Sequence, residues 1–256
     1  MSERTLIAWT DFTFNPFMGC TKVSPGCKNC YAETLTKNRM GLSVWGPGIE
    51  RKRTSVGYWR GPIKWNREAK RRMRVFCGSL CDVFEKGKVT DTARVDLWRL
   101  IRQTPELDWQ LLTKRPERIA NHLPDDWGTE GYPNVWLGTS CENQKYFDIR
   151  YPILAAIPAV VRFISYEPAL GPIDFHFPPT IPMPDWVIYG GESGPGFREE
   201  DKDWARSMHQ QCKLAGIAFF HKQSSAIKTE MGIELDGKIV REYPTPRHGS
   251  RPASLF

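Results

Sequence analysis

Short apolar segments alternate with longer segments of mixed polarity along most of the chain. Short runs rich in Val, Ile, Phe and Trp predict strands that are buried on both faces. The expected strands are residues 6–14, 74–80, 109–114, 134–140, 160–166, 185–189 and 217–221. The segments between them place apolar residues at helical spacing. The expected helices are residues 31–40, 64–72, 90–103, 143–156 and 202–215, with a further helix that starts at Pro116.

This alternation of strands and helices predicts an α/β domain with a parallel sheet covered by helices. We expect the domain to occupy residues 1–223, with an irregular basic insertion at 41–74 and a peripheral tail at 224–256. Ligands of such folds bind at the carboxyl ends of the strands, whether the sheet is open or closed into a barrel.

Polar residues gather where the expected strands end, which predicts one shared site at that end of the sheet. They are the cysteines between residues 20 and 30, Ser79, Asp82, Lys114, Arg115, residues 140–143, Glu167, Glu192, Lys222 and Gln223.

The composition is that of a globular protein with a substantial core. The chain has 256 residues, of which 40% are hydrophobic, with ten Trp and thirteen Phe. No apolar run approaches the length of a membrane span, and the first residues lack the long apolar segment of a signal peptide. We therefore expect a cytoplasmic protein without a membrane partner. Seven cysteines, odd in number and unevenly spaced, then predict metal ligands or free thiols rather than disulfides.

The net charge of +7 is unevenly distributed. Residues 51–74 contain ten Lys and Arg against a single Glu, interleaved with Tyr58, Trp59 and Trp65. Cations neutralise phosphates and aromatic rings stack on bases, so this composition is typical of a nucleic-acid surface. A solvated helix face would have a similar composition.

Three cysteines lie close together in a turn-rich loop, as Cys20-x6-Cys27-x2-Cys30. A structural zinc site has four ligands, but a second Cys-x2-Cys pair is absent and the histidines stand singly. Thiolates also bind iron–sulfur clusters, and a four-iron cluster held by three cysteines leaves one iron open to another ligand. The spacing alone leaves three interpretations open: an iron–sulfur cluster, a zinc ion with a distant fourth ligand, and unligated thiols.

A three-cysteine loop after the first strand of a β/α run resembles the radical S-adenosylmethionine (SAM) superfamily. The usual spacing there is Cys-x3-Cys-x2-Cys, so the longer first gap departs from it, whereas Cys27-x2-Cys30 followed by Tyr31 keeps it. Over roughly residues 8–223 the chain is also similar to an uncharacterised phage and bacterial three-Cys-motif family. The motifs that carry this similarity are Phe14-Asn-Pro-Phe-Met-Gly-Cys20, Lys22-Val-Ser-Pro-Gly-Cys27, Leu112-Thr-Lys-Arg-Pro116, Trp136-Leu-Gly-Thr-Ser140, Ser165-Tyr-Glu-Pro168 and Gly190-Gly-Glu-Ser-Gly194.

The superfamily resemblance implies an incomplete parallel (β/α) barrel, related to the TIM barrel. It implies that Cys20, Cys27 and Cys30 bind three irons of a [4Fe–4S] cluster, whose fourth iron chelates the amino and carboxylate groups of SAM. Reduction of the cluster, by a donor such as flavodoxin or ferredoxin, then cleaves SAM to methionine and a 5′-deoxyadenosyl radical that abstracts hydrogen from a substrate.

The same resemblance suggests contacts with SAM. Superfamily members often carry a Gly-Gly-Glu-like stretch after the second strand, where it holds the SAM amino group. The candidates are Gly78, Ser79 and Asp82 at that place, and Gly190, Gly191 and Glu192, a literal Gly-Gly-Glu that follows the sixth strand instead. Glycines at a strand end also serve ordinary turns.

Three further residues have two interpretations each. Glu167 is expected to bind ribose hydroxyls or an ammonium, or to form a salt bridge inside the barrel. Lys114 is expected to bind the SAM carboxylate or a substrate phosphate, although Pro116 nearby also fits a plain helix start. Cys141 is a candidate hydrogen-atom donor, or a small buried hydrophobe.

The sequence therefore predicts a radical SAM enzyme whose substrate is a nucleic acid or a nucleotide, with the reaction outcome undetermined. The alternative is a nucleic-acid-binding phage accessory protein, stabilised by zinc or by a cluster and without catalysis.

Overall fold

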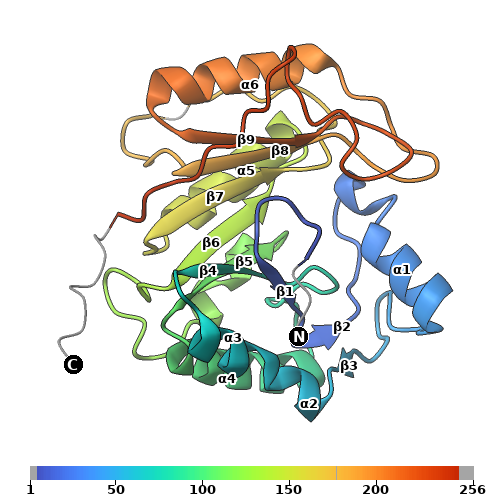
Figure 1. Cartoon of the computed structure of the whole chain (residues 1–256), viewed down its shortest axis with the longest axis vertical. Coiled ribbons are helices and arrows are strands. Elements are labelled where there is room, and N and C mark those ends of the chain that lie inside the picture. Colours follow the sequence, from blue (N-terminus) through green and yellow to red (C-terminus); the bar gives the residue numbers. More distant parts are fainter. Residues whose placement is uncertain (1–4, 177, 248–256) are drawn as a thin grey trace.

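The computed structural model of the chain describes residues 5–176 and 178–247, so the outermost parts of the expected domain and tail, 1–4 and 248–256, lie outside the described residues. Seven parallel strands form one curved sheet in the order β1-β4-β5-β6-β7-β8-β9 (Figure 1). They are β1 (Phe12–Phe14), β4 (Met73–Cys77), β5 (Leu107–Thr113), β6 (Val135–Ser140), β7 (Val161–Tyr166), β8 (Trp186–Gly190) and β9 (Ala218–Gln223). The sheet does not close between β1 and β9, so the predicted incomplete β/α barrel is confirmed.

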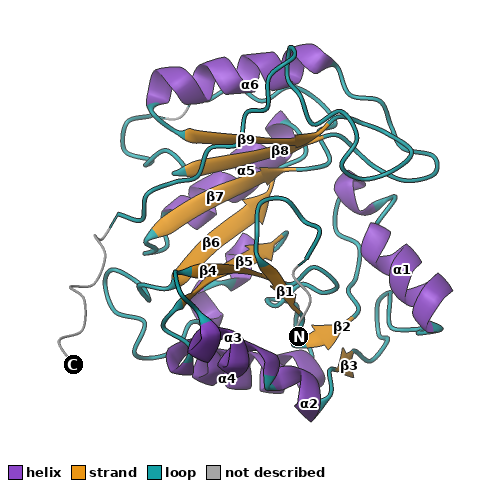
Figure 2. Ribbon diagram, viewed as in Figure 1, coloured by secondary structure: helices purple, strands orange, loops and turns teal. Residues whose placement is uncertain are grey.

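Helices cover the outer side of the curved sheet (Figure 2). These are α3 (Gly61–Glu68), α4 (Lys88–Gln103), α5 (Gln144–Ala155) and α6 (Lys202–Ala215). The short α2 (Val56–Trp59) precedes α3, and α1 (Tyr31–Met40) lies to one side of the sheet (Figure 1). The helix expected at Pro116 is instead two short 3-10 turns, η2 (Pro116–Arg118) and η3 (Ala120–His122). A further 3-10 turn, η1 (Pro25–Cys27), and a small antiparallel pair, β2 (Phe17–Met18) with β3 (Lys52–Arg53), flank the cysteines.

The hollow of the sheet is filled with aromatic side chains toward the amino ends of the strands. Trp9, from the segment before β1, packs on Phe76 at a centroid distance of 4.6 Å and edge-on against Trp186 at 6.0 Å. Val161 and Phe220 belong to the same buried cluster. This layer forms a dry floor beneath the carboxyl ends of the strands.

Gly138 on β6 is required by this packing. A Cβ atom there would overlap the ring of Phe163 on the neighbouring strand β7. The ring therefore lies directly on the glycine backbone, a close approach that a larger side chain forbids.

The segments at both ends of the sheet are bound to it. The N-terminal segment lies in the hollow of the sheet (Figure 1). Thr5 N donates to the Asp11 carbonyl at 3.2 Å, and Asp11 N donates to the Arg74 carbonyl on β4 at 3.0 Å. Beyond β9, Glu242 N donates to the Phe219 carbonyl at 2.9 Å, and the Trp186 indole N–H donates to the Glu242 carbonyl at 2.9 Å. Residues 240–242 of the expected tail therefore run beside β9 at the open edge, whereas the Arg247 N–H donates to the Val160 carbonyl, just before β7, at 3.0 Å.

The expected basic insertion contains β3, α2, α3 and the start of β4. Most of its arginines are paired with carboxylates. The pairs are Arg51–Glu85 (2.8 Å), Arg53–Asp96 (2.6 Å), Arg71–Asp11 (2.6 Å) and Arg72–Asp108 (2.5 Å). These charges stabilise the fold, which leaves fewer of them for phosphate contacts than the composition indicated. Among the described residues, no helix is long and apolar enough to cross a membrane.

Replacing Gly138 with alanine is expected to destabilise the protein by about 1–3 kcal/mol, because the new methyl group would force the Phe163 ring and its strand apart. Urea unfolding measures the change. Gly57→Ala is the control, since its Cβ meets nothing within 4 Å and its backbone is helical. Equal midpoints for the wild type and Gly138→Ala would contradict the close packing.

Asp11 predicts a pH dependence of stability. Burial alone would raise the pKa of this carboxyl, but hydrogen bonds from Arg71 and Arg74 and their charges lower it below its ordinary value. The stabilisation is therefore present above the unfolded-state pKa of about 3.9 and is lost as the pH falls through the folded-state pKa. In urea titrations between about pH 2 and 5, Asp11→Asn should show a flatter stability profile than the wild type. Parallel profiles would contradict the assignment.

Candidate active site at the cysteine loop

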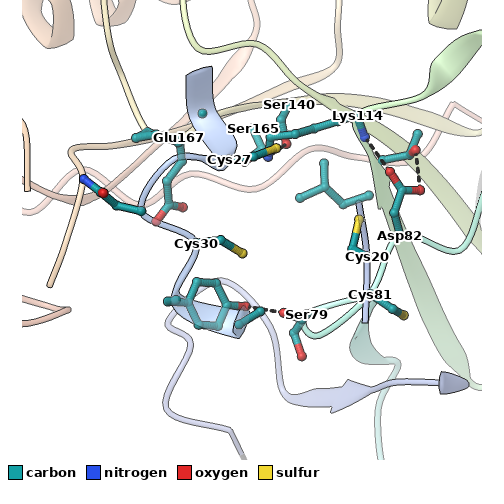
Figure 3. Close-up of a pocket in the computed structure, with 18 of the residues that line it drawn as sticks. Cys20, Cys27, Cys30, Ser79, Cys81, Asp82, Lys114, Ser140, Ser165 and Glu167 are labelled. Atoms are coloured by element: carbon teal, nitrogen blue, oxygen red, sulfur yellow. Dashed lines mark hydrogen bonds between the residues drawn. The ribbon is translucent and has the colours of Figure 1, made fainter. Parts of the chain in front are cut away.

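A cavity of about 360 Å³ opens at the carboxyl ends of the strands. Cys20, Cys27 and Cys30 line one side of it, and Figure 3 shows their sulfurs turned toward a common space. Trp9 and Phe76 line the floor. Polar residues from the strand ends complete the wall, namely Gly78, Ser79, Asp82, Lys114, Arg115, Ser140, Ser165, Glu167, Gly191, Glu192 and Lys222. The structure brings most of the polar residues at the predicted strand ends to one cavity, but Gly190, residues 141–143 and Gln223 do not line it.

The loop that carries the thiols starts at a special backbone position. Gly19 has a φ of +108°, and a Cβ there would overlap the Val44 carbonyl. Its N–H donates to the Leu80 carbonyl at 3.0 Å, which fixes the loop to the end of β4. The loop then forms the η1 turn and ends at Cys30, the N-cap residue of α1.

The turn at Cys20 is held by buried charges. Glu85, after β4, accepts hydrogen bonds from Thr21 N at 2.9 Å and from Arg51 at 2.8 Å. Arg115, after β5, donates to the Thr21 carbonyl at 2.8 Å and to Cys20 Sγ at 3.5 Å. All three charged side chains are at least nine-tenths buried, so these bonds are poorly screened by water.

The middle of the loop is held from β6. Glu142, just after this strand, is fully buried, and its carboxylate accepts the Gly26 N–H at 3.2 Å. Arg150 on α5 donates to the other Glu142 oxygen at 2.8 Å. A Cβ at Gly26 would lie 3.1 Å from the Glu142 carboxyl carbon, so glycine admits this carboxylate.

The end of the loop is held from β8. Glu192 accepts hydrogen bonds from Asn29 Nδ2 and from Arg198 N, both at 2.9 Å, and forms an ion pair with the Arg198 guanidinium. Arg198 also donates to the Pro25 carbonyl at 3.2 Å. Burial acts to raise the pKa of Glu192, but the bonds from Arg198 and Asn29 outweigh it and lower the pKa. We call the pairs Glu85–Arg115, Glu142–Arg150 and Glu192–Arg198 the loop braces.

Burial favours the protonated thiol at two of the three cysteines, Cys20 and Cys30. Burial, with the nearby Asp82 carboxylate, raises the pKa of Cys20 to about 12. Burial also raises the pKa of Cys30. Thiols of this kind become thiolates when a metal binds, because the metal charge replaces the proton. Within residues 5–176 and 178–247, no three His, Cys, Asp or Glu side chains are arranged to hold a single metal ion.

Two ammonium groups face the cavity from the strand ends. Lys114, after β5, donates to Ser140 Oγ at 3.1 Å, and Ser165 lies beside Ser140 in the sheet register. Lys222, on β9, pairs with Glu167 at 2.5 Å. Glu167 therefore takes the intra-barrel salt bridge that the sequence allowed, with Lys222 as its partner. A Cβ at Gly190 would lie 3.0 Å from the Glu167 carboxyl carbon.

The residues after β4 are engaged within the chain. Asp82 accepts hydrogen bonds from Thr113 Oγ1 at 2.7 Å and from Arg115 at 2.8 Å. Ser79 Oγ accepts from Asn15 at 2.9 Å, and Gly78 has a φ of +101°. The side chains of Asp82 and Ser79 therefore line the rim of the cavity and are hydrogen-bonded to other residues of the chain.

A family model described as "Protein of unknown function (DUF5131)" matches residues 4–244. The chain belongs to this family. The expectation of an uncharacterised family is thereby confirmed. No curated protein matches the chain.

Among solved structures, a double mutant of spore photoproduct lyase with bound AdoMet and dinucleoside spore photoproduct is similar to this DUF5131 chain. The sequences are 12% identical, the TM-score is 0.46, and the alignment covers 79% of this chain and 61% of the other. The chain thus spans less than two thirds of that protein. The likeness is too distant to inform the chemistry of the site.

Two of the candidate site residues of the DUF5131 chain, Cys141 and Gly191, are closely packed. The Cys141 thiol is fully buried in the core on the outer face of the sheet, with its pKa raised by burial. A Cβ at Gly191 would overlap Glu200 and the Ser225 backbone, so this glycine admits the segment after β9.

The loop braces include residues that the sequence did not single out. Glu85, Arg150 and Arg198 each lie in a polar segment of the sequence, and no regular spacing links them to the cysteines. The available signal was weak: Glu85 and Glu142 both follow an apolar strand end closely, as site carboxylates do. Their partners come from distant segments, and only the fold brings them together.

Replacing Glu142 with glutamine is expected to destabilise the protein by about 3–5 kcal/mol, because Arg150 would remain buried without its counter-charge. Chemical denaturation measures this loss. The matched control is Glu33→Gln, which breaks the more exposed pair with Lys22 and should change stability by less than about 1 kcal/mol. A Glu142→Gln protein as stable as the control would show that the carboxylate does not brace the loop.

Proposed function

We propose that this protein is a radical SAM enzyme. The observation that carries the proposal is the set of three thiols on one braced loop, facing a single cavity at the carboxyl ends of a parallel half-barrel. Cys20, Cys27 and Cys30 would hold three irons of a [4Fe–4S] cluster. When bound, the reduced cluster and SAM supply a 5′-deoxyadenosyl radical for hydrogen abstraction.

The donor set fits this cofactor. Thiolates are the ligands that iron–sulfur clusters take, and three of them on a short loop leave one iron for SAM. A structural zinc site takes four ligands, whereas the loop supplies three thiols and the sequence has no second Cys-x2-Cys pair. The donor set therefore favours a cluster over zinc.

The cavity offers charges that complement the amino and carboxylate groups of an amino acid. Lys114 has only the Ser140 hydroxyl as a partner among the described residues, so its ammonium is available to a carboxylate. Glu167, held by Lys222, presents its second oxygen to an ammonium or to ribose hydroxyls. Gly78 and Ser79 border the same space and would supply backbone contacts.

Other candidates would act by positioning. Asp82 orients Arg115 against Cys20, and Glu192 orients Asn29 next to Cys30. Gly190 and Gly191 give Glu167 and Glu200 the room they need. The aromatic floor of Trp9 and Phe76 keeps water from the reacting atoms, which protects a radical from quenching.

A nucleotide or a nucleic acid is the substrate class we propose, since the floor suits a planar base. A reducing, cytoplasmic setting belongs to the same proposal, because the thiols must stay unoxidised to bind iron. Cys141 as hydrogen donor would require the core around it to open, and Cys141→Ala tests that role: product yield from the substrate radical should fall while SAM cleavage continues.

The proposal is tested by anaerobic purification, iron and sulfide analysis, and incubation with SAM and dithionite. We expect about four irons per chain and release of 5′-deoxyadenosine. Cys30→Ala should lose the iron and the SAM cleavage, because one of three thiolate ligands is gone.

Cys212→Ala is the matched control, since this thiol is buried on α6 away from the cavity and should leave the iron content unchanged. One zinc per chain without SAM cleavage would instead identify the alternative, a nucleic-acid-binding protein without catalysis.

A further inference from the structure

Positive charge also gathers around the cysteine loop. Residues 20–55 contain seven Lys and Arg against Glu33 and Glu50, a net charge of +5. Glu33 pairs with Lys22 at 2.8 Å, which leaves Glu50 as the remaining acidic group of the segment.

Most of these cations are free, unlike the arginines between residues 60 and 74. In the part of the chain that the structure describes, six exposed cations near the loop have no carboxylate partner. They are Lys28, Lys37, Arg39, Lys52, Lys86 and Lys88, which we call the basic face. Arg71 and Arg72, by contrast, are both paired with aspartates.

A hydrogen-bond network places two members of the basic face, Lys52 and Lys86, next to the cysteine loop. Thr21, Arg51 and Glu85 are hydrogen-bonded to one another at 2.6–3.0 Å. Their neighbours in sequence, Lys22, Lys52 and Lys86, are exposed. The buried triad thus aligns three separate segments and sets a lysine beside each, next to Cys20. Figure 1 shows α1 and β3, which carry Lys37 and Lys52, on this same side.

Apolar side chains are exposed among these cations. Val23 is 42% exposed, Met40 48% and Ile49 46%. The Arg51 guanidinium binds the Ile49 carbonyl at 2.8 Å, so Ile49 is held close to the triad. An apolar centre with a charged rim is the anatomy of a protein–protein interface.

We propose that the basic face docks an acidic electron-carrier protein that reduces the cluster. This inference rests on the proposed function, since the carrier needs a cluster to reduce. The thiols belong to the same loop as Val23 and Lys28, so a partner docked here lies directly over the metal ligands. Complementary charge speeds the encounter of such partners, and a small interface lets them part again.

A protein partner explains the face better than a nucleic acid does. Phosphate binding by a single strand needs aromatic rings on which bases stack. The exposed apolar side chains among these cations are Val23, Met40 and Ile49. The exposed ring of Tyr31 instead borders the cavity, where its hydroxyl donates to the Ser79 carbonyl at 2.7 Å. The Trp45 indole N–H is already bound to Thr36 Oγ1 at 2.6 Å.

The test measures binding of photoreduced flavodoxin, an acidic carrier, to the full-length protein at several salt concentrations. Lys37→Glu/Lys52→Glu/Lys86→Glu should bind about tenfold or more weakly at low salt, with a smaller salt dependence than the wild type. Lys70→Glu/Lys202→Glu/Lys213→Glu is the matched control: it makes the same change in net charge at exposed positions before β4 and on α6, and should bind like the wild type.

Reduction kinetics separate this inference from the proposed function. The basic-face variant should cleave SAM at the wild-type rate with dithionite and more slowly with flavodoxin. Equal flavodoxin binding by the variant and the wild type would overturn the docking site and leave the enzyme intact. Lost affinity for a single-stranded oligonucleotide, with flavodoxin binding unchanged, would identify a nucleic-acid surface instead. A wild type that neither holds iron nor cleaves SAM would overturn both proposals.

Discussion

The cysteine loop has almost no regular structure of its own, and its geometry depends on buried ion pairs supplied by the sheet. Each loop brace places a carboxylate at the end of a different strand and uses an arginine to neutralise it. Removing one partner of a buried pair typically costs about 3–5 kcal/mol, so Glu85–Arg115 and Glu142–Arg150 are strong constraints, whereas Arg198 is partly exposed and its pair with Glu192 is weaker. The loop thereby acquires a fixed shape although turns and glycines dominate its sequence.

The parallel half-barrel provides the platform for this arrangement. Its floor of aromatic residues is apolar, whereas the next layer toward the carboxyl ends carries Lys114, Ser140, Ser165 and Glu167. Because every strand is parallel, all polar ends reach the same rim. Residues 240–242 line the unclosed edge beside β9, and the N-terminal segment is bonded to β4 through Asp11, whose N–H donates to the Arg74 carbonyl.

Much of the fold follows from sequence pattern, because strands buried on both faces and amphipathic helices leave clear periodic signals. Residues 31–40 and 202–215 are helices with the expected bounds, and each expected strand overlaps a strand of the sheet. The first of them, expected at residues 6–14, is shorter and covers only Phe12–Phe14. The predicted helix at Pro116 was wrong, since residues 116–118 and 120–122 form two 3-10 turns. The convergence of the cysteines with Lys114 and Glu167 was also predictable from strand ends. The loop braces were not predictable, because charge pairing between distant segments leaves no local pattern in the sequence.

The sequence distances within the braces bear on how the protein is made. Thr21 and Glu85 are 64 positions apart, Gly26 and Glu142 are 116 apart, and Asn29 and Glu192 are 163 apart. During synthesis from the N-terminus, the cysteines leave the ribosome before the carboxylates of the braces do. The last brace can form only after the strand before Glu192 has folded. The loop that carries the thiols therefore lacks its full set of braces while most of the chain is synthesised. Maturation of the site is thus a late step, governed by completion of the sheet rather than by the local sequence around the cysteines.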